Sequence, residues 1–126
     1  MSPAAQQQLA KFESFVAEVG RINSLVEQFA VAKTGQDNLK ASLKRAAGMS
    51  KLKFMTSGLA QLSQNCAAIE MAASRSGAQG AMARSLRELV GQLRFQIDFE
   101  MRNIIREDAE LQMKKKKAAA DQNNSE

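Results

Sequence analysis

Apolar residues recur along this chain at alternating steps of three and four, the periodicity of one face of an α-helix. The first series is Phe12, Phe15, Val19, Ile22, Val26 and Phe29. A second is Leu52, Met55, Leu59, Leu62, Cys66, Ile69 and Ala73, and a third is Met82, Leu86, Val90, Leu93, Ile97, Met101 and Ile104. The only proline is Pro3, so no later residue removes a backbone donor from a helix. The pattern therefore predicts long amphipathic helices.

Two short segments rich in glycine and polar residues separate these series. Residues 34–38 contain Gly35, which suits the left-handed cap at the end of a helix, and Asp37, which suits the start of the next one. Residues 74–80 contain two glycines and two serines. Ser2, directly before the proline, is typical of a helix start. We therefore expect three helices joined at these two turns.

The second expected helix has an irregular register. Leu39 and Leu43 begin its apolar face, but Gly48-Met49-Ser50 interrupts the spacing. Either one long helix carries a stutter at Gly48, or two helices meet there with Ser50 as the new cap. We favour a single long, bent helix.

The third series has a competing pattern. Between Leu93 and Met101, apolar and polar residues alternate strictly, as they do in a half-buried strand. A lone strand would leave its backbone groups without a partner, because no other segment reads as a strand. We therefore predict a helix, in which Phe95 and Phe99 lie beside the main apolar face.

Together these features predict an all-α fold: an elongated antiparallel bundle of three long amphipathic helices, the second either continuous or broken near Gly48, with coiled-coil-like packing. Residues 1–113 would form a single domain. Residues 114–126 begin with four lysines and then offer only alanine as apolar content, which cannot bury enough surface to hold a fixed place. We expect a basic C-terminal tail that begins as a fraying helix and continues as disordered chain.

The composition argues against most catalytic and metal chemistry. There is no histidine and one cysteine, Cys66, so histidine-dependent triads, histidine-containing zinc sites and intramolecular disulfides are excluded. No glycine-rich phosphate loop is present. We therefore predict no catalytic residue, metal, cofactor or small-molecule substrate, and read Cys66, which lies on an apolar stripe, as a buried inert thiol.

A single cysteine fits a reducing compartment, and neither a secretory start nor an apolar run of the ~20 residues needed to span a bilayer is visible. The expected location is cytoplasmic, with the nucleus as the alternative.

The strongest candidate binding residues are aromatic and arginine side chains on the third helix. Phe95 and Phe99 are four residues apart, and Arg102 and Arg106 follow on the same side. Aromatic residues and arginine are enriched at the energetic centres of protein interfaces. The competing interpretation is that both rings complete the bundle core. We predict a partner-binding site at these four residues.

Basic residues form a second candidate site, for anions. The chain has 18 basic and 13 acidic residues, a formal charge of +5. Five of the basic residues are clustered in the second expected helix: Lys40, Lys44, Arg45, Lys51 and Lys53. Four more open the tail: Lys114, Lys115, Lys116 and Lys117. Either group could contact phosphates or an acidic partner, although a plain solvated face is the simpler interpretation.

These observations favour a non-catalytic structural or adaptor subunit that binds another protein, or itself, through an amphipathic helix face. The partner would be a second copy or a member of a hetero-oligomeric complex. One alternative is a small basic nucleic-acid-binding protein, although Trp and Tyr stacking residues are absent. A second is a peripheral membrane-associated helical protein that meets an anionic membrane surface.

Overall fold

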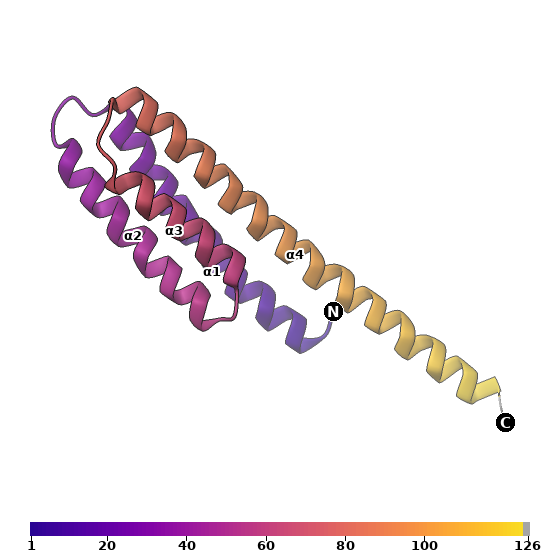
Figure 1. Ribbon diagram of the computed structural model, residues 1–126. Helices are drawn as coiled ribbons and strands as arrows, with labels where there is room; N and C mark the ends of the chain where they lie inside the picture. Colours follow the sequence, from indigo (N-terminus) through magenta and orange to yellow (C-terminus); the bar gives the residue numbers. More distant parts are fainter. Residues whose placement is uncertain (125–126) are drawn as a thin grey trace.

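The computed structural model describes residues 1–124, which form four α-helices and no strand. The helices are α1 (Pro3–Val31), α2 (Gln36–Thr56), α3 (Ala60–Ser74) and α4 (Gln79–Asn124). Successive helices reverse direction, so the chain runs up, down, up and down (Figure 1). The predicted all-α antiparallel bundle is confirmed, whereas the prediction of three helices was wrong.

The fourth helix arises from a break at Gly58 rather than at Gly48. α2 continues through Gly48 to Thr56, and Gly58 follows it with a φ of 74°. Beyond its last turn, the Leu59 amide donates to the Phe54 carbonyl oxygen over 2.9 Å, and the Gly58 amide donates to that of Met55 over 3.1 Å. This is the Schellman arrangement, in which a left-handed residue after the helix satisfies its last carbonyls. The chain then folds back, so α3 packs against α2 instead of extending it.

The four helices form a ring in which each contacts two neighbours: α1 with α2, α2 with α3, α3 with α4, and α4 with α1. Within the described residues, neither diagonal pair of helices is in close contact. Phe15 lies edge-to-face against both Phe12 and Phe54, with ring centroids 5.2 and 4.8 Å apart. All three series of apolar residues contribute to this one core.

Side chains from two other helices, Gln36 of α2 and Gln79 of α4, cap the C-terminal end of α1. The Gln79 side-chain amide donates to the carbonyl oxygens of Phe29 and Ala32, each over 2.7 Å. Gly35, expected to end α1, instead has its left-handed conformation directly before α2. Asp37 lies in the first turn of α2, and no side-chain hydrogen bond caps that helix. A glutamine distant in sequence therefore does the capping that we expected from local residues.

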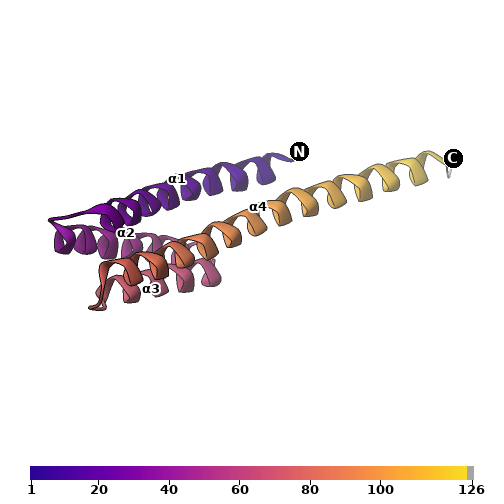
Figure 2. The same cartoon turned by 90° about the horizontal axis from the view of Figure 1, so that it is seen from above.

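α4 is much longer than its neighbours, with 46 residues and a length of ~69 Å from the helical rise. Its first half packs in the four-helix ring. Past the α2–α3 turn only α1 accompanies it, as far as the contact between Ser2 and Asp108, and then α4 projects alone (Figures 1 and 2). We call the projecting segment, residues 109–124, the overhang.

The segment in which we expected a fraying helix followed by disorder is part of α4, which is helical through Asn124. Lysine and alanine are good helix formers, and no glycine or proline interrupts this segment. Residues 114–122 are all exposed. Ser125 and Glu126 lie outside the described residues.

Candidate protein-binding surface

The aromatic rings singled out from the sequence lie on the outside of the bundle. Phe95 is 70% exposed and Phe99 is 49% exposed, whereas Leu93 and Ile97 between them are buried. The segment is helical, so the strand interpretation was wrong. The alternating pattern arises because α4 carries apolar residues on two opposite faces. In the single chain, neither ring completes the core.

The two arginines lie on the same outward face of α4. Because each residue of an α-helix is rotated by 100° around the helix axis, Arg102 and Arg106 project within about 20° of Phe95 when α4 is viewed down its axis. Both are exposed, and the Arg106 guanidinium is 4.0 Å from the Glu110 carboxylate. The structure therefore brings the four predicted residues into one row, which we call the Phe–Arg face: Phe95, Phe99, Arg102 and Arg106.

A shallow polar hollow borders the Phe–Arg face on the side of α3. Residues of both helices line it: Gln61, Asn65, Glu88, Gly91, Gln92, Phe95 and Gln96. Sequence reasoning missed the contribution of α3, because the pairing of α3 with α4 depends on the break at Gly58. Gly91 leaves open space beside Phe95, since a Cβ added there would meet no atom within 4 Å.

The basic cluster of α2 is largely occupied by contacts within the bundle. The Lys40 ammonium donates to the carbonyl oxygen of Arg75 over 2.8 Å, at the end of α3. The Lys51 ammonium is 3.2 Å from the Glu70 carboxylate. Lys53 forms an ion pair with Glu18 of α1. Three of the five predicted anion-binding cations therefore already have partners.

These contacts also separate the cations spatially. Because α2 is continuous, Lys40, Lys44 and Lys51 share one face, and the contacts of Lys40 and Lys51 direct that face toward α3. Lys53 instead contacts α1. Lys44 and Arg45 are exposed and have no ion pair within the described residues. The structure therefore does not gather the cluster into one open patch.

The four tail lysines are exposed on the overhang, beyond the end of α2 (Figure 1). They form a separate group from the α2 cations. Since no neighbouring helix accompanies the overhang past the start of α1, these lysines are the more accessible of the two predicted basic groups.

An exposed apolar strip on α2 was assigned to the core on the basis of the sequence. Leu52 and Met55, together with Met49, point to solvent. The buried positions of α2 are instead Leu43, Ala47, Ser50 and Phe54. These four residues also follow the three-and-four spacing. The sequence did not reveal this buried face, because Ser50 is polar and Phe54 does not belong to the apolar series identified from the sequence.

The one cysteine is an interior thiol, as predicted. Cys66 is fully buried, and burial raises its pKa to about 12, with the negative charges of Glu18 and Glu70 adding to the effect. A thiol with this pKa is protonated at neutral pH and is a poor nucleophile. Among residues 1–124, no three acidic or thiol side chains are placed to hold a metal ion.

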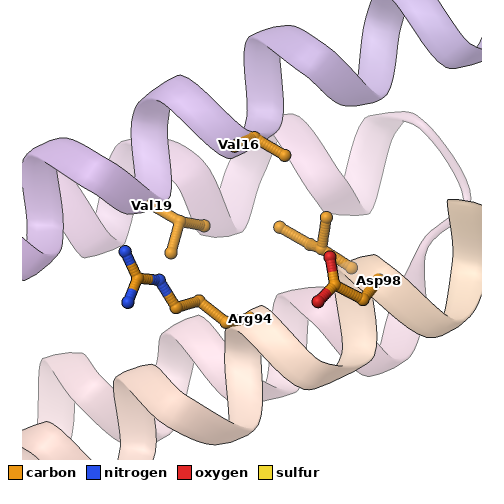
Figure 3. A pocket seen from close by; sticks show the side chains of 5 residues that line it. Val16, Val19, Arg94 and Asp98 are labelled. Atoms are coloured by element: carbon orange, nitrogen blue, oxygen red, sulfur yellow. The ribbon is translucent and has the colours of Figure 1, made fainter.

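A small hollow lies between α1 and α4 (Figure 3). Val16 and Val19 of α1 line it together with Ile97 of α4, and Arg94 and Asp98 of α4 lie opposite the two valines. Its walls are apolar, and the two charged groups come from successive turns of one helix. The hollow offers contact area for an apolar side chain but no paired carboxylates or nucleophile.

None of the described helices combines the length and apolar content required to cross a bilayer. Comparison of the chain with protein-family models, with curated proteins and with solved structures gave no match. The chemistry of the surface itself is therefore the basis for a functional proposal.

Proposed function

We propose that this protein is a non-catalytic adaptor or structural subunit that binds another protein through the Phe–Arg face of α4. The observation that carries the proposal is the exposure of Phe95 and Phe99 on a face opposite the core. An exposed phenylalanine forgoes roughly 1.5–3 kcal/mol of burial free energy, which a partner surface can recover.

The row of side chains also indicates what kind of partner fits. Phe95 and Phe99, one turn apart, form a ridge of the kind that an amphipathic helix lays into an apolar groove. Arg102 and Arg106 continue the ridge with positive charge. We therefore expect a partner whose apolar groove is bordered at one end by carboxylates, and whose association is coiled-coil-like.

The contacts of α2 make the nucleic-acid alternative weaker. A phosphate-binding face needs free cations, and Lys40, Lys51 and Lys53 are engaged with other parts of the bundle. The membrane alternative is weakened by geometry. The exposed apolar strip of α2 and the Phe–Arg face lie on diagonal helices of the ring, so one flat surface cannot contact both.

The proposal is tested with the double variant Phe95→Ser and Phe99→Ser, compared with wild type by affinity capture from an extract of the source organism. The matched control is Val31→Ser, which alters a residue that is 75% exposed at the far end of α1. We expect a protein that wild type and the control retain and the double variant loses.

Two measurements make the result decisive. Circular dichroism should give the same melting temperature for all three proteins, because the changed side chains lie outside the core. The captured complex should persist at about 0.5 M salt, since an apolar interface is little screened. Retention of the same partner by the double variant, or unfolding of that variant, would contradict the proposal.

A further inference from the structure

No other described helix covers the overhang of α4. Residues 109–122 are exposed apart from half-buried Gln112, and the start of α1 lies beside Asp108. Isolated helices of about 15 residues are marginal in water. A helix that projects this far gains stability from any surface that covers it.

The buried stripe of α4 continues into the overhang, but its chemistry changes. After Leu93 and Ile97, steps of three and four along the stripe lead to Glu100, Ile104, Glu107, Leu111, Lys115 and Ala118. We call this series the seam. It is acidic before Leu111 and basic after it, and Leu111 itself is 47% exposed.

An open groove runs along the acidic half of the seam. Where α2 and α3 stop, α1 and α4 remain side by side, with Ser57 and Leu59 closing one end. Glu100, Ile104 and Glu107 form the α4 wall of this groove. The α1 wall contributes one cation, Lys11, so the two carboxylates leave the groove with a net negative charge. This charge suits a basic helix with small side chains.

We propose that the occupant is the overhang of a second copy of this chain, in a reciprocal antiparallel dimer centred on Leu111. In that register, Leu111 meets Leu111, Ile104 meets Ala118, and Glu107 meets Lys115. Each copy places its basic overhang in the acidic groove of the other. The resulting interface is self-complementary, as two-fold symmetry requires.

Charge selects this direction of pairing. A parallel in-register pair would set Lys114 to Lys117 against the same four lysines, and like charges in close opposition are unfavourable. The antiparallel pair overlaps over residues 100–122, a length of ~34 Å from the helical rise. The small side chains of Ala118 and its neighbours permit close approach of the helices.

This interface is distinct from the Phe–Arg face. Phe95 and the seam lie on opposite sides of α4, so the dimer leaves both Phe–Arg faces open. The inference therefore goes beyond the proposed function, and either one can fail while the other holds.

Sedimentation equilibrium on the full chain tests the proposal through a charge swap. One variant carries Lys114→Glu with Lys115→Glu, and the other carries Glu100→Lys with Glu107→Lys. Each variant alone should dimerise at least roughly tenfold more weakly than wild type, because like charges now face each other. An equimolar mixture should form a heterodimer with wild-type affinity, since both grooves then hold an overhang of opposite charge.

Two controls should dimerise as wild type does: Lys44→Glu with Arg45→Glu, and Phe95→Ser with Phe99→Ser. The first changes the same number of charges away from the seam, and the second removes the other candidate surface. A wild-type protein that stays monomeric, variants that dimerise like wild type, or a mixture without heterodimer would each overturn the proposal.

Cysteine cross-linking tests the direction of the helices. A mixture of Ile104→Cys and Ala118→Cys chains should form a disulfide-linked dimer under mild oxidation, whereas neither variant alone should do so. Buried Cys66 leaves only the introduced thiols accessible. Cross-linking of Ile104→Cys with itself would indicate parallel pairing and overturn the antiparallel dimer.

Discussion

The backbone amide of Ser2 donates a hydrogen bond to the side chain of Asp108 over 3.2 Å, which ties the start of α1 to α4. Ser2 also caps α1, because its hydroxyl accepts a hydrogen bond from the Ala5 amide over 3.1 Å. The hydrogen bond from Ser2 holds the pKa of Asp108 below its ordinary value of 3.8. This contact marks the point beyond which α4 continues alone.

Replacing Asp108 with alanine should loosen the first turns of α1 without unfolding the bundle. Hydrogen exchange is the appropriate measurement, and amides near Ala5 should exchange faster in the variant, while those of the central core should not. Glu110→Ala, on the exposed side of α4, is the matched control. Unchanged exchange at the start of α1 would show that the contact contributes nothing.

The same contact should respond to acid. Because the folded-state pKa of Asp108 is lowered, its contribution to stability is present above pH 3.8 and is lost as the pH falls through the folded-state value. The protection of amides near Ala5, measured relative to their intrinsic exchange rate at each pH, should therefore fall in wild type at low pH. It should approach the protection seen in Asp108→Ala. A constant difference between the two proteins across this range would contradict the assignment.

Phenylalanines in the core and on the Phe–Arg face should respond differently to truncation. Phe54→Ala should lower the free energy of unfolding by about 3–5 kcal/mol, because the ring is fully buried against Phe15. Phe95→Ala should change it by no more than about 0.5 kcal/mol, since the ring is mostly exposed. Urea denaturation, at a concentration where the chain is monomeric, measures both. Comparable losses would place Phe95 in the core.

Replacing glycine with alanine should change the stability of the protein in opposite directions at Gly58 and at Gly20. Gly58→Ala should destabilise the protein by about 1–2 kcal/mol, because its φ of 74° is unfavourable for a residue with a Cβ. Gly20→Ala should stabilise it by about 0.5–1 kcal/mol, since Gly20 lies inside α1 and a Cβ there meets no atom within 4 Å. Thermal denaturation distinguishes the two outcomes.

Cys66 should make the protein less stable at alkaline pH. Its pKa rises from an ordinary 9.0 to about 12 on folding, so the thiol is protonated in the folded chain where it would ionise in the unfolded one. Its contribution is therefore fully present below pH 9 and is lost as the pH rises toward 12. The free energy of unfolding of wild type should fall more steeply above pH 9 than that of Cys66→Ala. Parallel curves would contradict the raised pKa.

The sequence by itself determined the all-α class, the antiparallel order and the row of Phe95, Phe99, Arg102 and Arg106, because periodicity within one helix depends only on the helical repeat. It also indicated that Cys66 is buried. The exposure of the two rings was left open, since α4 carries apolar residues on two faces and local spacing does not say which face meets the other helices.

Tertiary structure decided the features that depend on which helices meet. The break at Gly58 was hidden because two solvent-exposed residues of α2, Leu52 and Met55, continue the apolar spacing of α3 across the turn. The engagement of Lys51 and Lys53 depends on acidic partners on α3 and α1. The overhang could be recognised only from the tertiary structure, because the sequence of α4 does not show where the neighbouring helices end.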